Sequence, residues 1–266
     1  MLKTRLISCL VLRNNVIVQS IGFRRYLPVG GAGISMEFVA QWDVDEIFLV
    51  DITATKESRK SNRDLIASVS KNCFVPLTVG GGIHDLEDIK IAIRAGADKI
   101  SINSEAVRNP AFITDASRRY GSQCIVVSMD VKRDESKKQH EVFADSGKAA
   151  TGLEAVQWAK TVEAHGAGEI FLNSIDRDGM KNGYDLEVLR RVSEAVSIPV
   201  IACGGVGVMA HFVAGVLEGR ASAVAAANIF HHTEHSTIVA KAYLRNAGIP
   251  VRLNTAAKYA GFSFDD

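Results

Sequence analysis

The 266-residue sequence lacks a long hydrophobic segment, an excess of charge of one sign and a paired set of cysteines. No apolar run approaches the roughly 18 residues of a transmembrane helix, which excludes a membrane-spanning protein. The 31 Lys and Arg residues nearly balance the 30 Asp and Glu residues, so no nucleic-acid-binding or membrane-binding surface is expected. The N-terminal apolar run is too short for a signal peptide, and we expect a cytoplasmic protein.

Disulfides, metals and cofactors are not expected either. The four cysteines are isolated and mostly lie in apolar strand-like runs, as buried thiols in a reducing compartment do; they are Cys9, Cys73, Cys124 and Cys203. His231 and His235 are spaced as two metal ligands on a helix would be. No carboxylate or cysteine pattern completes a set of ligands around them.

Short β-branched runs alternate with helical patterns along the chain. Eight candidate strands occur, at residues 5–12, 46–52, 76–79, 99–102, 124–130, 169–174, 199–202 and 223–226. Asp85 can cap a helix that carries Leu86, Ile89 and Ile93 on one face. Eight strands, each followed by a helix, favour parallel pairing and predict a (β/α)₈ TIM barrel of the α/β class. An open doubly wound sheet is the alternative fold.

The two halves of the chain resemble each other. DEIFL at 45–49 recurs as GEIFL at 168–172, and VPLTVGG at 75–81 recurs as IPVIACGG at 198–205. A two-fold repeat of four strand–helix units generates both matches and favours the barrel. We therefore expect one TIM-barrel domain over residues 1–253, followed by a C-terminal extension at 254–266.

Two long connections interrupt the rhythm, at residues 13–33 and 132–150. The first ends in a glycine-rich run, and the second is crowded with charged residues. We expect both to be loops. Loops of this length inside a compact domain are often functional lids. For the second connection, a tolerated surface insertion is an equal alternative.

Candidate binding residues follow the strands at their C-terminal ends, where TIM barrels carry their chemistry. Gly80-Gly81-Gly82 and Asn103-Ser104 end the third and fourth strands, and Gly204-Gly205 and Ala227-Asn228 take matching places in the second half. Glycines let backbone N–H groups approach an anion closely. Two such pockets would hold a ligand with a phosphate at each end, unless the glycines only form tight turns.

Three aspartates lie near strand ends as well. Asp130 ends the fifth strand, and Asp51 and Asp178 lie near the ends of the second and sixth. A carboxylate at a barrel mouth can act as general acid or base, or bind sugar hydroxyls; capping and ion pairing are the alternatives. The repeat would place a fourth carboxylate at the mate of Asp130, but that position holds Val11.

Four charged residues stand at the opposite, N-terminal ends of the strands. They are Arg5, Glu46, Lys99 and Glu169. Two cations and two anions can close the barrel bottom as an ion-paired ring, because buried charges require partners. A ring that only seals the barrel is the simpler interpretation.

These residues together resemble the cyclase subunit of imidazole glycerol phosphate synthase, from Met1 to about Leu253. The matching stretches are FLVDITA at 48–54, TVGGGIHD at 78–85, GADKISIN at 96–103, SIDRDG at 174–179 and GYD at 183–185. In that family a partner glutaminase makes ammonia at the barrel bottom. The ammonia passes through the barrel to a bis-phosphorylated ribulosyl aminoimidazole intermediate at the top. The products are imidazole glycerol phosphate and an aminoimidazole carboxamide ribotide.

The resemblance implies roles for the candidate residues. Arg5, Glu46, Lys99 and Glu169 match the gate of the ammonia tunnel, and Asp98 matches a residue that faces the glutaminase in the heterodimer. The implied phosphate-binding residues are Gly81, Gly82, Asn103, Ser104, Gly179, Gly204, Gly205, Ala227 and Asn228. Asp51 and Asp178 would contact the substrate. Asp130 matches one of two aspartates credited with acid–base catalysis.

The chamber departs from the family pattern. The second catalytic aspartate falls on Val11, which can neither accept nor donate a proton. Gln19 replaces a loop lysine, Cys203 replaces a serine beside a phosphate pocket, and Asn173 and Met180 stand where threonines are usual. This combination resembles a divergent branch found in bacterial surface-polysaccharide (O-antigen) gene clusters. That branch supplies ammonia to a sugar amidotransferase, which converts an N-acetylated nucleotide sugar to an acetamidino form.

Three functions are compatible with this sequence. The first is an ammonia-channelling subunit whose own cyclisation chemistry is lost or changed. The second is a histidine-biosynthesis cyclase in which another group replaces the missing aspartate. The third is a non-catalytic activator of the glutaminase. All three imply a glutaminase docked at the barrel bottom.

Overall fold

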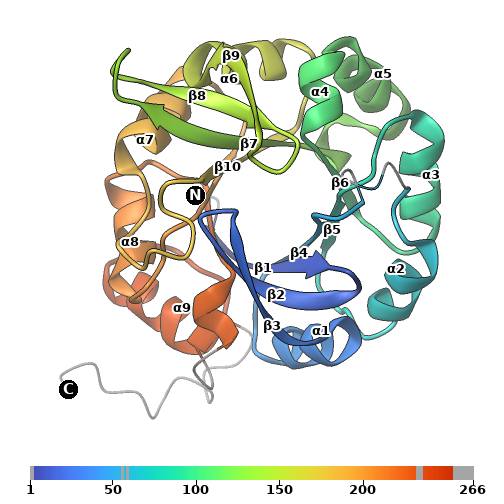
Figure 1. Cartoon of the computed structure of the whole chain (residues 1–266). Helices are drawn as coiled ribbons and strands as arrows, with labels where there is room; N and C mark the ends of the chain where they lie inside the picture. The colour runs from blue at the N-terminus through green and yellow to red at the C-terminus, as the bar shows by residue number, and fades with distance from the viewer. Residues whose placement is uncertain (1–2, 55–56, 58–59, 232–235, 254–266) are drawn as a thin grey trace.

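The computed structural model describes residues 3–54, 57, 60–231 and 236–253. Its centre is a closed ring of eight parallel strands with helices outside it (Figure 1). In ring order the strands are β1 (Arg5–Arg13), β4 (Glu46–Asp51), β5 (Leu77–Gly80), β6 (Lys99–Ile102), β7 (Ile125–Asp134), β10 (Glu169–Ser174), β11 (Val200–Cys203) and β12 (Ala223–Ala226). Because β12 pairs with β1 and β7 pairs with β10, the ring has no free edge. The TIM-barrel prediction is confirmed, and the open doubly wound sheet is wrong.

All eight predicted strands are present. Their ends differ from the prediction by at most one residue, apart from β7, which continues to Asp134. Along six of the eight strands, side chains alternate between two apolar clusters, as a pleated backbone requires, and β5 and β6 contribute to the outer cluster alone. On β1, Leu6 and Leu10 belong to the large cluster beneath the helices, while Ile7 and Cys9 belong to a smaller one inside the barrel.

Helices cover the outside of the ring. They are α1 (Ala32–Gln41), α2 (Arg63–Ser70), α3 (Leu86–Arg94), α4 (Ser104–Arg108), α5 (Ala111–Tyr120), α6 (Ala155–Ala164), α7 (Leu186–Ala195), α8 (Ala210–Leu217) and α9 (Ser236–Asn246), with short 3₁₀ turns η1 (Ser122–Cys124) and η2 (Asn228–His231). The predicted cap of α3 is confirmed: the Asp85 carboxylate accepts a hydrogen bond from the Asp88 N–H at 2.8 Å. The Asp88 carboxylate reciprocates to the Asp85 N–H at 3.3 Å, which completes a capping box.

The prediction that the two long connections are loops is wrong, because each forms an antiparallel β-ribbon. β2 (Val16–Ile21) pairs with β1 and β3 (Arg25–Gly31), and β8 (Gln139–Ala144) pairs with β7 and β9 (Ala149–Glu154). Asn14 and Asn15 turn β1 into β2 with φ of 50° and 62°, the left-handed geometry of a two-residue hairpin. An Asn-Asn pair signals such a turn more weakly than Asn-Gly, so the sequence concealed the ribbon.

The predicted two-fold repeat appears in the strand register. β1 pairs with β4 so that Ile7 lies opposite Glu46 and Val11 opposite Val50. β7 pairs with β10 in the equivalent way, with Asp130 opposite Asn173. Val11 therefore occupies the position in the first half that Asp130 occupies in the second.

Two predictions concern residues outside the described ranges. They are the C-terminal extension at 254–266 and the histidine at 235. Within the described ranges, no helix combines the length and the apolar character that crossing a membrane would require.

Candidate functional site

A cavity opens at the C-terminal ends of the barrel strands and gathers most of the predicted site residues. Nine of them line it: Val11, Asp51, Gly81, Gly82, Asn103, Ser104, Asp130, Asp178 and Ala227. Gly179, Gly204, Gly205 and Asn228 lie outside its lining, although the neighbouring Cys203 is part of it. The strand ends thus form one chamber, as the barrel topology demands.

Asp130 is the carboxylate best suited to proton transfer. Its side chain is buried at the end of β7, where burial and the negative charge of Asp178 raise its pKa to about 7, against the opposing effect of a hydrogen bond from Asn173. The Asn103 amide donates a hydrogen bond to the Asp130 carboxylate at 3.3 Å. A carboxyl group that titrates near neutral pH can both donate and accept a proton under ordinary conditions.

Asp178 and Asp51 are held by hydrogen bonds of their own. The Asp178 carboxylate accepts from the Ser20 hydroxyl at 2.6 Å and from the Phe23 N–H at 3.2 Å. Burial raises the pKa of Asp178, while these bonds lower it. The Asp51 carboxylate accepts from the Thr53 N–H at 3.0 Å and the Thr53 hydroxyl at 2.8 Å, so it stabilises the turn after β4.

The opposite side of the chamber is apolar where the repeat would place a carboxylate. Val11 is half-buried at the edge of the cluster inside the barrel, beside Cys9 and Val50. Its position is equivalent to that of Asp130, but its isopropyl group can only contribute contacts. Of the two positions that the repeat relates, one therefore carries a carboxylate and the other an apolar side chain.

The glycine pairs of the two halves share one geometry. Gly81 and Gly82 have φ of 94° and 70°, and Gly204 and Gly205 have φ of 91° and 100°. A Cβ added at Gly81 would lie 2.1 Å from the carbonyl oxygen of Asp51, so no side chain fits there. These turns alone account for the glycines, and the two phosphate pockets stay a prediction.

Ser20 on β2 also lines the chamber, and sequence reasoning missed it. Besides its bond to Asp178, its carbonyl oxygen accepts a hydrogen bond from the Asn228 amide at 2.8 Å. A Cβ at Gly179 would lie 2.6 Å from the same oxygen. Asp178, Gly179 and Asn228 therefore hold the β2–β3 ribbon over the mouth, a role that a loop interpretation could not reveal.

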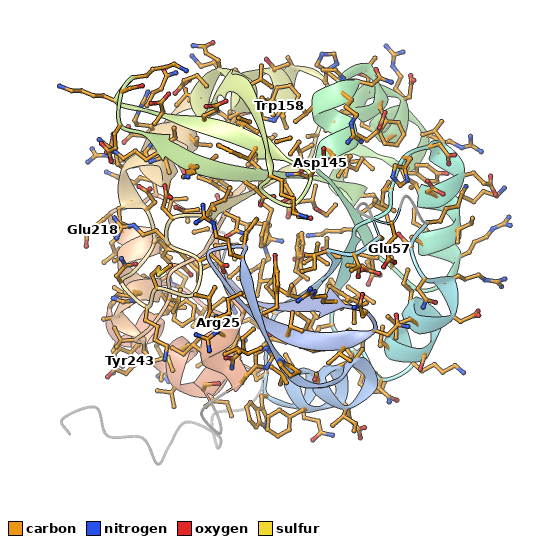
Figure 2. All side chains as sticks on the ribbon, in the orientation of Figure 1. Arg25, Glu57, Asp145, Trp158, Glu218 and Tyr243 are labelled. Atoms are coloured by element: carbon orange, nitrogen blue, oxygen red, sulfur yellow. The ribbon has the colours of Figure 1, made fainter. Side chains whose placement is uncertain are left out.

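Ser104 joins the mouth to the second ribbon. Its hydroxyl accepts a hydrogen bond from the Asp145 N–H at 2.9 Å, and the Arg108 guanidinium donates to the Asp145 carboxylate at 2.6 Å. Asp145 lies toward the centre of the ring in the view of Figure 2. Both ribbons are thus anchored to strand ends that carry predicted site residues.

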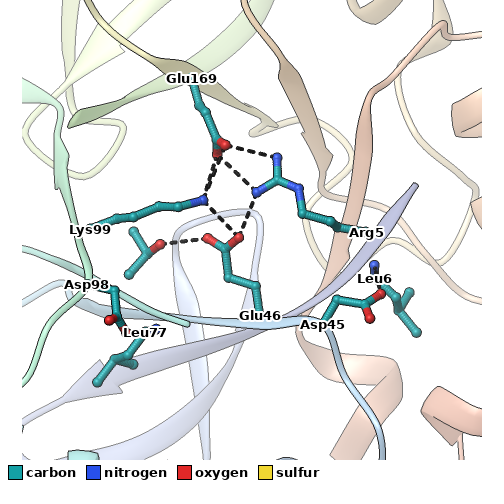
Figure 3. Close-up of polar contacts among 9 residues, drawn as sticks. Arg5, Leu6, Asp45, Glu46, Leu77, Asp98, Lys99 and Glu169 are labelled. Carbon is teal, nitrogen blue, oxygen red and sulfur yellow. Dashed lines mark hydrogen bonds and ion pairs between the residues drawn. The ribbon is translucent and has the colours of Figure 1, made fainter. Parts of the chain in front are cut away.

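The four charged residues at the barrel bottom form an ion-paired ring (Figure 3). The Arg5 guanidinium contacts the carboxylates of Glu46 at 2.7 Å and Glu169 at 3.0 Å. The Lys99 ammonium contacts the same two carboxylates at 3.0 and 3.2 Å. Burial lowers the pKa of Arg5, but the charges of Glu169 and Glu46 outweigh it and raise that pKa overall. Each cation therefore bridges both anions, which offsets the desolvation of the buried carboxylates.

The residues that precede two of these charges tie neighbouring strands together. The Asp45 carboxylate accepts a hydrogen bond from the Leu6 N–H at 2.8 Å, and the Asp98 carboxylate accepts one from the Leu77 N–H at 2.8 Å (Figure 3). Asp45 is buried against the ammonium of Lys241, whereas Asp98 is exposed at the bottom rim. Asp98 thus stands where a molecule docked on this face would meet it.

Two aromatic rings lie inside the barrel between the charged ring and the mouth. Phe48 and Phe171 stack with ring centroids 4.0 Å apart and an interplanar angle of 24°. They lie two residues after Glu46 and Glu169 on the same strands, and both also line the mouth cavity. Sequence reasoning missed this pair, although the DEIFL and GEIFL repeat places them at equivalent positions.

Comparison with known proteins identifies the family. The profile of the family described as "Histidine biosynthesis protein" matches residues 5–236. A Vibrio vulnificus (strain YJ016) protein with the provisional name imidazole glycerol phosphate synthase subunit hisF2 is 49% identical over 266 residues, which span all of this chain and 97% of that protein. The chain belongs to this family. It is a homologue of the imidazole glycerol phosphate synthase cyclase, and the resemblance of the five sequence stretches is confirmed.

The raised pKa of Asp130 predicts that the stability of this protein depends on pH. Between about pH 4 and 7 the folded carboxyl keeps a proton that the unfolded chain has already released, so stability falls as pH rises through this window. Asp130→Asn removes this dependence. Its unfolding free energy should equal that of the wild type near pH 4 and exceed it by up to ~4 kcal/mol at pH 8. Urea unfolding of both proteins across this range measures the difference, and a constant difference would contradict the assignment.

Proposed function

We propose that this chain receives ammonia from a glutaminase partner at the barrel bottom and conducts it to the mouth, with its own cyclase chemistry lost. The ammonia then serves a sugar amidotransferase in surface-polysaccharide synthesis. One observation carries the proposal: the four-charge ring at the bottom is complete, while the mouth has Val11 at the symmetry position of Asp130.

The bottom face supports a glutaminase heterodimer. The ring of Arg5, Glu46, Lys99 and Glu169 closes the N-terminal end of the barrel. In it, cations alternate with anions. Asp98 is exposed beside it and is available to a partner. The Vibrio vulnificus relative is named as a subunit, which accords with an assembly of two chains.

The barrel interior suits a neutral molecule. Above the charged ring, the lining is mostly apolar and includes Ile7, Phe48, Phe171 and Ile201, with the hydroxyls of Ser101 and Ser128 beside them. Ammonia carries no charge and can enter such a lining, whereas ammonium would lose its hydration without gaining a partner. The stacked Phe48 and Phe171 rings fill the lumen at their level, so we infer that ammonia passes when the rings separate.

The mouth suits a phosphorylated ligand but not two-carboxylate catalysis. Gly81, Gly82 and Asn103 of the first half line the chamber and would face one phosphate, while Ala227 is the member of the second predicted pocket that lines it. Ring closure in the family's reaction needs a proton removed at one place and delivered at another. Asp130 can do one of these tasks, and Val11 can do neither.

A second candidate function is an active cyclase of histidine biosynthesis. The observation that favours it is the pair formed by Asp130 and Asp178, whose charges interact across the chamber. Two carboxyl groups with different pKa values are the usual arrangement for an acid and a base. In this case Asp178 replaces the missing aspartate, and the gene should rescue a histidine auxotroph that lacks its cyclase.

A cyclase assay separates the two functions. Purified protein is given the bis-phosphorylated intermediate with ammonium salt, and product formation is measured for the wild type and Val11→Asp. We expect no measurable turnover by the wild type, because a proton-transfer group is missing. Val11→Asp should gain turnover by at least about a hundredfold over the wild-type background, the usual contribution of one acid–base group.

Val50→Asp is the matched control for this assay. Val50 lies opposite Val11 in the register and also lines the cavity, so the change places the same carboxylate in the same chamber at another position. It should gain nothing. Wild-type turnover that disappears in Asp178→Asn would instead establish the histidine-biosynthesis function.

The role of the charged ring is tested by Lys99→Ala in the complex with the glutaminase. The complex receives glutamine labelled with ¹⁵N in its amide and unlabelled ammonium, in a cell extract that completes the amidation. Removing Lys99 breaks contacts to both Glu46 and Glu169, so ammonia should escape and the labelled share of the product should fall several-fold. Lys90→Ala removes a half-buried lysine that pairs with Glu87 on the same helix α3, away from the charged ring, and should keep the wild-type share. An unchanged share in Lys99→Ala would refute the ammonia path.

The stacked rings are tested by changing the size of Phe48 in the same assay. Phe48→Leu should open the lumen and raise transfer of labelled nitrogen, while Phe48→Trp should lower it several-fold because the lumen is already filled. Phe112→Leu is the control, since Phe112 is buried between α5 and the barrel rather than inside it. Equal transfer in all three variants would show that ammonia does not pass these rings.

A further inference from the structure

A second cavity lies beside the mouth, between the two β-ribbons. It has a volume of about 690 Å³, within the usual range for small-molecule sites. Residues of β1 to β3 form one wall, and residues of β7, β8 and their connections form the other. It shares Phe23, Tyr26, Ile52 and Ser146 with the mouth cavity, but none of the predicted catalytic or phosphate-binding residues lines it.

The walls of this cavity are strongly cationic. Four basic side chains line it: Arg13, Arg24, Lys132 and Lys148. Glu57 is the one acidic residue of the described lining, and it lies inside the ring of helices in Figure 2. Among the residues that the structure describes, no carboxylate forms an ion pair with any of the four cations. Their charges therefore attract an anion from solution.

Aromatic side chains line the same cavity. Phe23, Tyr26 and Phe143 are each half-buried, so part of every ring stays accessible. The Arg13 guanidinium lies 4.8 Å from the centroid of the Tyr26 ring, which joins a cation to an aromatic face. Aromatic rings stack on any planar heterocyclic base, because stacking does not depend on the hydrogen-bond donors and acceptors of that base.

The aromatic wall is fixed before any ligand arrives. Phe23 has a φ of 57°, a left-handed conformation that is strained for a bulky residue. Its N–H donates to Asp178, and its carbonyl oxygen accepts from the Tyr26 hydroxyl at 2.9 Å. A Cβ at Gly147 would lie 2.7 Å from the Phe23 ring, so the ring packs directly on the second ribbon. The ribbons thus hold Phe23 at the boundary of both cavities, in a conformation that it would not adopt alone.

We propose that this second cavity binds a nucleoside diphosphate. The phosphates contact the four cations, and the base stacks on the rings of Phe23, Tyr26 and Phe143. Phosphate groups form charge-assisted hydrogen bonds with guanidinium and ammonium groups. The basic residues and the aromatic residues are thus two separate observations, one pointing to the phosphates and the other to the base. The second cavity borders the mouth cavity, but none of the predicted gate, catalytic or phosphate-binding residues lines it, so this inference and the proposed function can fail independently.

Calorimetric titration of the full chain tests the site, with ADP, UDP, pyrophosphate and adenosine as probes at one ionic strength. Both diphosphate nucleotides should bind more tightly than pyrophosphate or adenosine, because only they use both kinds of wall. Arg24→Ala combined with Lys148→Ala should weaken ADP binding by about tenfold or more. Both side chains are exposed, so the fold should tolerate their loss. Tyr26→Leu should weaken ADP by about tenfold while leaving pyrophosphate unchanged.

Two controls decide where a nucleotide binds. Arg94→Ala combined with Lys160→Ala removes the same charge from exposed positions on α3 and the outer helix α6, and it should leave ADP binding unchanged. Asn103→Asp places a repelling charge in the mouth and should also leave it unchanged. The inference is overturned if ADP does not bind at millimolar concentration, if both double variants weaken it equally, or if only Asn103→Asp does.

Discussion

Closure of the eight-stranded ring is the constraint on which the remaining structure depends. In a closed barrel every second side chain of a strand must point inward, so each strand contributes one inward series from bottom to top. On β4 this series is Glu46, Phe48 and Val50, and on β10 it is Glu169, Phe171 and Asn173. One register thus sets the charged ring, the aromatic stack and the chamber wall together, and a shift by one residue would displace all three.

The same register explains why the chamber is unequal on its two sides. Asp130 lies opposite Asn173 in the register, and burial together with the charge of Asp178 raises its pKa to about 7. Its mate Val11 is paired with Val50 and extends the apolar lining of the barrel upward. The bottom of the barrel carries charged residues from both halves, whereas at the mouth a carboxylate stands at only one of the two equivalent positions, that of Asp130.

The ribbons add what the barrel alone does not supply. They are anchored by Asp178 and Asn228 on one side and by Ser104 on the other, all at strand ends of the mouth. This anchoring places basic and aromatic side chains from distant parts of the chain around one cavity. The ribbons thereby add a second cavity to the barrel. It lies next to the chamber, and none of the chamber's carboxylates lines it.

By itself, the sequence determined the strands, the two-fold repeat, the cap of α3 and the residues at each strand end, because these depend on local patterns and on spacing along the chain. It also identified Val11 as the exception, since the repeat marks its position. Only the tertiary structure decided that Phe48 and Phe171 stack, that Ser20 joins Asp178 to Asn228, and that the long connections are ribbons. The ribbons are local hairpins whose Asn-Asn turn is a weak signal, whereas the ring stack and the Ser20 contacts join residues far apart in sequence. Closure of the barrel creates such contacts, and no local pattern encodes them.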